Sequence, residues 1–354
     1  MPSIENSHQA TQALHADDRL NLVTDVAPPL HLSTIFRYPS DPNKFTVSED
    51  PVAEFDGTNF VYSREFAPDQ TRFEAILSSL LKGHAARAIT VAHEVIAVVS
   101  RLSGLQKLSL DCSPEDLNEG DVILLETPIN PLGTAFSIEE YAKKAHSRGA
   151  YLIVDSTFAP PSLQDPFLWS ADIVMHSGSQ YFGGHSDLLC DRLALGNVLG
   201  NMESWLGVRS LRTLEVRVQR ASHNSAKLIS WLHDALCAPS PAPGSEGAIV
   251  QAVLQKVYHA SLQNEPWLKK QMPNGFGPVF SIVLHREDHA KHLPSKLHYF
   301  QHATSLGGVE SLIEWRALSD PRVDRKLLRI SVGLENWEDL KNDQLQAFQS
   351  LIQV

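Results

Sequence analysis

The sequence has few cysteines, no long apolar run and no basic excess, and each shortage excludes a class of protein. Its 354 residues include three cysteines, Cys112, Cys190 and Cys237, without a C-x-x-C spacing. This argues against a disulfide framework or a zinc knuckle. We expect three small buried residues in a reducing compartment. The longest apolar stretches, VIAVV and YLIV, are far shorter than the ~18 residues that a membrane-spanning helix needs.

Acidic residues outnumber basic ones, with 41 Asp and Glu against 30 Lys and Arg and a net charge of −11. Because nucleic acids and anionic membranes attract basic surfaces, the sequence predicts neither as a partner. The first 20 residues are polar and resemble neither a secretory signal nor an Arg-rich transit peptide. We therefore expect a soluble cytoplasmic protein. The length predicts two domains, or one large domain with attachments.

The order of apolar runs predicts a parallel sheet. Strand-like runs occupy residues 88–92, 122–126, 151–155 and 171–176. Capping boxes, in which a Ser or Thr is followed three residues later by Glu, predict helices beginning at Thr71 and Ser137. Continuous apolar strands that alternate with amphipathic helices are typical of a parallel sheet covered on both faces.

The second half of the chain predicts more helix and at least two more strands. A helical pattern runs from about 203 to 236, interrupted only by Gly207. A Pro/Gly/Ser-rich loop follows at 238–247. The remaining predicted elements are strands at 280–284 and 327–334 and a helix at 336–352.

Polar residues follow three of the predicted strands, where parallel sheets bind ligands. The first strand ends in Glu126 before the loop 127–131, the second in Asp155, and His176 to Gln180 follow the next. A buried carboxylate is costly unless something pairs with it. Asp155 is therefore either a group held for a cationic ligand atom or a structural cap or ion pair.

An ordered set of motifs resembles the Cys/Met-metabolism family of pyridoxal-phosphate (PLP) enzymes, the transsulfuration group of cystathionine γ-synthases and lyases. The motifs are VTDVAPPLHLSTIFRYP, VYSREFAPDQTRFE, ETPINPLG, IVDSTFAPP, DIVMHSGSQYFGGHSD, VRSLRTLEVRV, TSLGGVESLIE and RISVGLE. They span about residues 23–340 in the family's order, and the ordered set is specific although each motif alone is weak. The first and the SLGGVESLIEWR stretch are most similar to a fungal-type branch.

The resemblance implies an α/β fold of the aspartate-aminotransferase-like type (fold type I). This fold has a large PLP-binding domain with a mostly parallel sheet, a smaller α/β C-terminal domain and an extended N-terminal arm. The corresponding expected bounds are 1–62 for the arm, 63–237 for the large domain and 238–354 for the small domain.

The resemblance also implies roles for residues of the cofactor site. Asp155 matches the aspartate that pairs with the pyridine nitrogen of PLP, and Thr157 lies beside it. Ser177 and Ser179 match hydroxyl residues that bind the cofactor phosphate. Asn130 matches an asparagine near the cofactor and substrate.

Four further residues match positions that the resemblance assigns to the neighbouring subunit or the substrate. Tyr62 and Arg64 match a pair that reaches the phosphate from a neighbouring subunit, which implies a homo- or hetero-oligomer. Arg329 matches the arginine that binds the substrate carboxylate, and Ser305 lies in the loop that assists it. The alternative for Arg329 is an ordinary charge at a strand end. The implied substrates are amino acids such as an O-acyl-homoserine or cystathionine.

Two departures affect the cofactor site. Gln180 stands where the family has the lysine that bonds covalently to PLP and transfers protons, and an amide does neither. The strand at 88–92 also runs directly into His93, so a phosphate-binding turn, its helix, a strand and a ring-stacking tyrosine are missing at 92–93. The missing block is roughly 25–35 residues, about the size of a βαβ unit.

Several explanations and functions stay open at this point. The chain is a degenerate paralogue, the product of a mis-joined exon, or a variant changed to trap a complex. Independently of this, its function is that of a PLP-dependent transsulfuration enzyme, impaired as the chain stands, of a non-catalytic binding or hetero-oligomer partner, or of a pocket with lysine-free chemistry. His176 and His185 fit no metal-ligand spacing, so we predict no metal site. Gly183 and Gly184 form a turn rather than a dinucleotide-binding loop.

Overall fold

The computed structural model describes residues 7–21, 26–33, 36, 60, 67–82, 106–188 and 199–353. The predicted strand at 88–92, the predicted gap at 92–93, Cys190, Tyr62 and Arg64 lie outside these residues. The chain divides into two compact units, one of residues 1–107 and 177–215 and one of residues 108–176 and 216–354. These bounds differ from the arm and two domains expected from the sequence, a division that stays a prediction.

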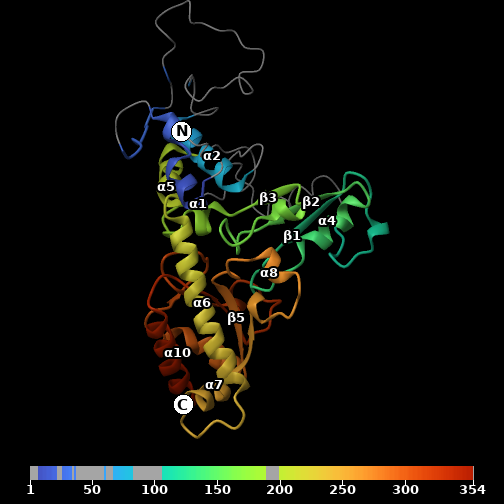
Figure 1. Cartoon of the computed structure of the whole chain (residues 1–354). Helices are drawn as coiled ribbons and strands as arrows, with labels where there is room; N and C mark the ends of the chain where they lie inside the picture. Colours follow the sequence, from blue (N-terminus) through green and yellow to red (C-terminus); the bar gives the residue numbers. More distant parts are fainter. Residues whose placement is uncertain are drawn as a thin grey trace, which may run out of the picture. The chain divides into compact units, whose positions relative to one another are not determined.

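A three-stranded parallel sheet forms one part of the second unit (Figure 1). Its strands are β1 (Val122–Glu126), β2 (Tyr151–Asp155) and β3 (Ile173–Met175), in the order β1-β2-β3. The three predicted strands and their parallel arrangement are thus confirmed. Helix α4 (Ile138–His146) connects β1 to β2, and the short helices η4 (Pro114–Asp116) and η5 (Pro166–Trp169) flank the sheet.

Helix α4 covers one face of this sheet. Its predicted start is confirmed, since the Ser137 side chain accepts a hydrogen bond from the Glu140 backbone N–H at 3.3 Å. The inward side chains of β1 and β2 pack against it in one apolar cluster, which includes Leu125, Leu152 and Val154. Burial of this face is what ties β1, α4 and β2 into a βαβ unit.

The opposite face is buried only toward the ends of the strands, so the expected burial along both faces is wrong. The first residues there, Val122, Tyr151 and Ile173, are each 53% exposed. At the end of β2, in contrast, Asp155 is 5% exposed. The expectation assumed a second layer of helix along the whole strand, which the described residues of this unit do not supply.

A five-stranded mixed sheet forms the second part of the same unit. Its order is β4-β5-β8-β7-β6, all neighbours antiparallel except β6 and β7. The strands are β4 (Leu254–Tyr258), β5 (Val279–Leu284), β6 (Gln301–His302), β7 (Leu312–Trp315) and β8 (Leu327–Ser331). Strands β5 and β8 confirm the two predicted ones, while β4, β6 and β7 were not predicted.

Helices pack on this sheet around one large core. The long helices are α6 (Leu214–Cys237), α7 (Glu246–Val253) and α10 (Trp337–Ile352), and the short ones are η7 (Ala260–Leu262), α8 (Leu268–Gln271), α9 (Glu287–His292), η8 (Leu293–Lys296) and η9 (Arg316–Leu318). Phe280 of β5 and Phe348 of α10 are among its fully buried side chains. The predicted terminal helix is confirmed, with Asn336 as its N-cap.

The first unit is built on helix α2 (Pro68–Leu81), with α1 (Gln9–His15), η2 (Asp18–Leu20), α5 (Asn201–Leu211) and η6 (Gly178–Phe182). The predicted apolar face of α2 is buried at Phe73, Ile76, Leu77 and Leu80. Its predicted start at Thr71 is wrong, because Pro68 occupies the first turn and Thr71 already donates its backbone N–H to the Ala67 carbonyl oxygen. Proline suits that position since its missing N–H has no helical partner there.

Two further expectations about this unit are corrected. The long helical pattern breaks at residues 212–213, between α5 and α6, and not at Gly207. Gly207 lies inside α5, where an added Cβ would come within 2.6 Å of the Phe73 ring. The region expected to be an extended arm contains helix α1, and the buried Asp17 pairs with Arg72 at 3.0 Å.

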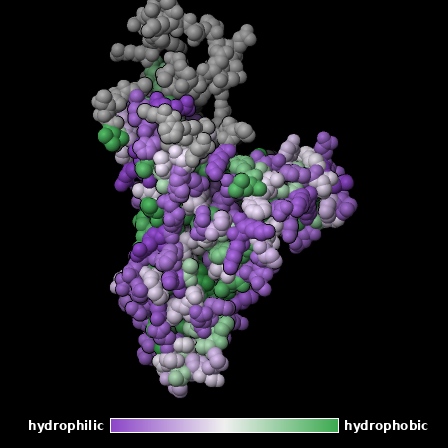
Figure 2. Space-filling view, in the orientation of Figure 1, coloured by the Kyte–Doolittle hydropathy of each residue, from purple (hydrophilic) through white to green (hydrophobic). Residues whose placement is uncertain are grey.

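The described surface is mostly hydrophilic on the face that Figure 2 shows, with small apolar areas. No helix within the described ranges is long and apolar enough to cross a membrane. The same residues contain no group of three or more His, Cys, Asp or Glu side chains suited to a metal ion. Cys237 is exposed and Cys112 partly exposed, so the expectation that the cysteines are buried is wrong for these two.

Candidate functional site

Asp155 is held rigidly at the end of β2. Its Oδ1 atom accepts hydrogen bonds from the Thr157 backbone N–H at 3.0 Å and from the Thr157 hydroxyl at 2.6 Å. Short charge-assisted bonds of this kind fix the carboxylate in one orientation. The pair of Asp155 and Thr157 that the sequence predicted is thus brought together at the strand end.

Glu126 lies beside Asp155, on the neighbouring strand. The two residues are register partners in the parallel pair β1–β2, and such partners project from the same face of a sheet. Burial, with repulsion from the Asp155 carboxylate, raises the pKa of Glu126 to about 8. Glu126 is therefore mostly protonated at neutral pH.

Arg329 joins the loop after β1 to the second sheet. Its guanidinium donates to the Asn130 Oδ1 atom at 3.1 Å and to the Ser305 carbonyl oxygen at 2.8 Å. The structure thus brings together Asn130, predicted as a cofactor-binding residue, and Ser305 and Arg329, predicted as substrate-binding residues. Ser305 has a φ of 79°, a backbone conformation that non-glycine residues rarely adopt. This conformation aims its carbonyl group at Arg329.

Glu314 on β7 supplies the buried counter-charge for Arg329, and the sequence analysis missed it. Its Oε2 atom lies 2.6 Å from the Arg329 Nη2 atom, with both side chains about 95% buried. Glu314 also accepts hydrogen bonds from the Arg316 guanidinium at 3.0 Å and from the Ser319 hydroxyl at 2.7 Å. The available signal was a glutamate inside the apolar strand LIEW, where an unpaired charge would be costly.

Hydrogen bonds from the buried side chains of Gln271 and Ser281 fix the loop between β1 and α4, which carries Asn130. Gln271 accepts from the Ile138 N–H at 2.9 Å and donates to the Phe136 carbonyl oxygen at 3.0 Å. The Ser281 hydroxyl donates to the Pro131 carbonyl oxygen at 2.7 Å. These bonds hold Asn130 near Arg329, since each one links the loop to the body of the unit.

Ser177, Ser179 and Gln180 lie in the other compact unit, within or beside the short π-helix η6. Gln180 has non-helical backbone angles, φ −89° and ψ −119°, which kink this turn. Its carbonyl oxygen accepts from the Gly184 N–H at 2.7 Å. The three residues thus lie in one short segment, and the roles assigned to them stay predictions.

His176, which follows β3, has both ring nitrogens shielded from solvent. Burial lowers the pKa of His176 to about 3, so the ring is neutral at neutral pH. A neutral buried imidazole agrees with a structural role.

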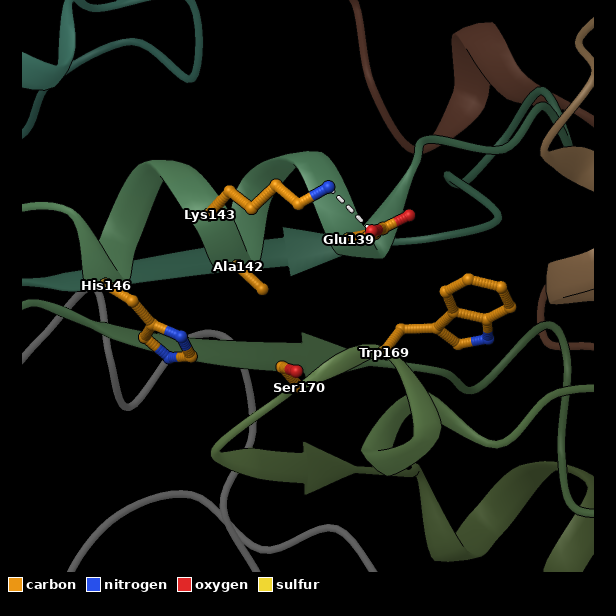
Figure 3. Close-up of a pocket in the computed structure, with 6 residues that line it drawn as sticks. All are labelled: Glu139, Ala142, Lys143, His146, Trp169 and Ser170. Carbon is orange, nitrogen blue, oxygen red and sulfur yellow. Dashed lines mark hydrogen bonds and ion pairs between the residues drawn. The ribbon is translucent and has the colours of Figure 1, made fainter.

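A pocket of about 340 Å³ lies between α4 and the end of η5. Figure 3 shows Lys143 pointing toward Glu139 along the helix, with 2.6 Å between Nζ and Oε1. Both side chains are exposed, which makes this a weak surface ion pair. The pocket contains none of the residues that the sequence assigned to a site.

A family model described as Cys/Met metabolism PLP-dependent enzyme matches residues 112–349. Cystathionine gamma-lyase of Bacillus subtilis (strain 168) is 31% identical over an alignment 356 residues long. This alignment covers 83% of this chain and 90% of the relative. Cystathionine beta-lyase of Lactococcus lactis subsp. cremoris (strain MG1363) is 35% identical over 261 residues, which cover 65% of this chain. The match spans 64% of the length of that relative.

Solved structures share the fold. The structure of metB from Corynebacterium glutamicum superposes with a TM-score of 0.80 at 24% identity, covering 99% of this chain and 100% of the other. Cystathionine gamma-lyase from Lactobacillus plantarum, complexed with L-serine, gives a TM-score of 0.77 at 26% identity, covering 98% and 100%. The expected α/β fold of type I is thereby confirmed.

Proposed function

Because the chain belongs to the Cys/Met metabolism family of PLP-dependent enzymes, we propose that it is a transsulfuration-type protein whose turnover is impaired. Its ligand class is an amino acid such as cystathionine or an O-acyl-homoserine. The observation that carries the impairment is Gln180, in the position where the family motif has a lysine. The relatives are a cystathionine lyase from Bacillus and one from Lactococcus, which supports the substrate class.

The residues around Asp155 fit the ring of PLP. A buried carboxylate needs a positive partner, and the pyridine nitrogen of the cofactor is one when protonated. Thr157 already orients Asp155 through two hydrogen bonds. Bound PLP supplies an electron sink for chemistry at an amino acid, and the protein supplies binding, orientation and electrostatics. By the sequence resemblance, the hydroxyl groups of Ser177 and Ser179 would bind the cofactor phosphate.

The residue at position 180 does not fit a covalent link. A glutamine amide is neither nucleophilic nor titratable near neutral pH, so it forms no bond to the cofactor and accepts no proton. No lysine lies nearer in the sequence than Lys144 and Lys227. Loss of a positioned acid–base group costs about 10²–10⁴-fold in rate. We therefore propose that PLP binds non-covalently and that turnover is lower by at least this factor.

Arg329 would bind the substrate carboxylate. Its position is set by Glu314, Asn130 and Ser305, which engage the guanidinium from three sides. An incoming carboxylate would add to this network as a second anion. The network thus pre-orients the arginine, which saves ordering entropy on binding.

We also propose that the deletion at 92–93 affects the parallel sheet. Half-exposed Val122, Tyr151 and Ile173 at the starts of three neighbouring strands are consistent with a missing covering segment. Sequencing the transcript across Ala92 and His93 tests this proposal. Extra residues at that junction would attribute the gap to a mis-joined exon, while an unchanged junction supports a degenerate paralogue. Membership of the fungal-type branch is likewise a proposal.

A non-catalytic partner role is the second candidate, and Gln180 favours it. A chain without a lysine at position 180 can still contribute Tyr62 and Arg64 to the site of an active neighbour, the role that the sequence resemblance implies for them. Co-expression with an active family member would then give a mixed oligomer. Its activity should fall when Arg64 is replaced by alanine in this chain alone.

The primary test measures covalent attachment. Wild-type protein is mixed with PLP, treated with borohydride and analysed by peptide mass mapping. We expect no modification of the peptide that contains Gln180. The Gln180→Lys variant should be modified at residue 180, while Gln180→Ala serves as the matched control for modification of surface lysines. A wild-type chain with a borohydride-stable cofactor at a single site would overturn the proposal.

A further inference from the structure

Three acidic and two basic side chains share the buried region at the ends of β1 and β2. Glu126 and Asp155 are neighbours on adjacent strands. Arg329 and Arg316 act on Glu126 from the second sheet and η9, and Glu314 pairs with both arginines. Among these five described side chains, the carboxyl groups outnumber the guanidinium groups by one if all are ionised.

Geometry identifies the odd acid as Glu126. Glu314 lies within 3.0 Å of two guanidinium groups, and Asp155 accepts two bonds from Thr157. Glu126 receives a backbone hydrogen bond from Asn130, and the positive charges of Arg329 and Arg316 act on it more weakly than burial and Asp155 do. A proton on Glu126 makes the cluster electrically neutral, which removes the cost of an unpaired buried charge.

We propose that Glu126 is a proton-linked positioning residue, which carries a proton in the ligand-free protein and gives it up when a cationic ring nitrogen binds against Asp155. The inference rests on the proposed binding of the cofactor ring at Asp155. Glu126 acts through Asp155 and is not itself in contact with the ring. The cation offsets the negative charge of Asp155 and so removes the repulsion that, together with burial, keeps Glu126 protonated. The proton leaves to solvent or to the ring.

The sign of the pH dependence follows from this linkage. Below about pH 8 the cation must displace the Glu126 proton, so its binding tightens as pH rises. Between pH 6 and 8 the ratio of the wild-type Kd to the Kd of Glu126→Gln should fall by up to roughly tenfold per pH unit. Above pH 8 Glu126 is already ionised, and the ratio should level off.

The experiment counts protons during PLP binding by calorimetry at pH 7, in buffers with different ionisation enthalpies. With a pKa of about 8 for Glu126, the wild-type protein should release more protons than Glu126→Gln, by up to about 0.9 proton. Protons that the cofactor itself takes up are the same in both proteins, and the difference removes them. Glu139→Gln, an exposed glutamate on α4, is the matched control and should behave as wild type.

Two further measurements keep the proposal falsifiable. A 1-deaza analogue of PLP, which lacks the ring nitrogen, should show no difference between wild type and Glu126→Gln. Infrared spectroscopy of the ligand-free protein should show a carboxylic-acid carbonyl band at pH 7 that is missing in Glu126→Gln. This measurement needs no PLP, so it tests the proposal even if the variant does not bind the cofactor. Equal proton release, or an absent band, would overturn the role of Glu126, whereas the borohydride test of Gln180 would be unaffected.

Discussion

Replacement of Glu314 by glutamine should destabilise the second unit, because it removes one partner of a buried ion pair. The guanidinium of Arg329 is 4% exposed and lies 2.6 Å from the Glu314 carboxylate. Glutamine keeps the shape but removes the carboxylate that pairs with Arg329, while the neutral acceptors Asn130 and Ser305 remain. Removing one partner of a buried ion pair typically costs 3–5 kcal/mol. We expect a loss of about 3 kcal/mol, at the lower end of this range, because the two neutral acceptors remain.

Urea denaturation followed by circular dichroism measures this change in the free energy of unfolding. The exposed pair of Glu139 and Lys143 provides the matched control, since Glu139→Gln should cost less than about 1 kcal/mol. The double variant Glu314→Leu with Arg329→Met should recover most of the loss, because it removes both charges and leaves none unpaired. A cost below about 1 kcal/mol for Glu314→Gln would refute the assignment of a buried, mutually dependent pair.

The remaining predictions concern pH, packing and the ring edge. Burial alone would raise the pKa of Glu314, but the charge of Arg329 and the hydrogen bonds that Glu314 accepts lower it below the ordinary value of 4.5. The ionised Glu314 should therefore contribute to the free energy of unfolding above about pH 4.5, and this contribution should be lost as pH falls further. Urea titrations at a series of pH values measure it. Gly207→Ala should destabilise the first unit by about 1–3 kcal/mol, since the new Cβ meets the ring of Phe73, and thermal unfolding measures it. Thr157→Val should weaken PLP binding several-fold in a fluorescence titration, because Asp155 loses its 2.6 Å hydroxyl donor, whereas Thr157→Ser should retain most of the affinity.

The sequence predicted the strands of the parallel sheet and the polar residues at their ends well because one local rule governs them. Each strand is a continuous apolar run, and a polar residue at its end marks the edge where ligands bind. Asp155 and Thr157 lie there as expected. Helix boundaries were less predictable. Thr71 satisfies the capping pattern, yet Pro68 begins the helix earlier, and the pattern itself does not distinguish a true N-cap from a Thr in the first turn.

Long-range pairing explains the rest of what the sequence did not predict. Glu314 and Arg329 are adjacent only because β7 and β8 pair with these residues in register. No spacing in the sequence encodes that contact. Likewise, the raised pKa of Glu126 depends on the register between β1 and β2, which places a second carboxylate beside it. The identity of each residue was visible, but its chemical state follows from neighbours that only the fold brings close.

The most direct test of the account measures where PLP attaches in wild type and in Gln180→Lys after borohydride treatment under identical conditions. The account predicts that peptide mass mapping finds no specific attachment in wild type and one cofactor bonded to residue 180 in the variant. A wild-type protein that bonds one cofactor at a defined lysine would contradict the claim that Gln180 prevents the covalent link. A variant that bonds none at residue 180 would contradict the claim that the rest of the cofactor site survives.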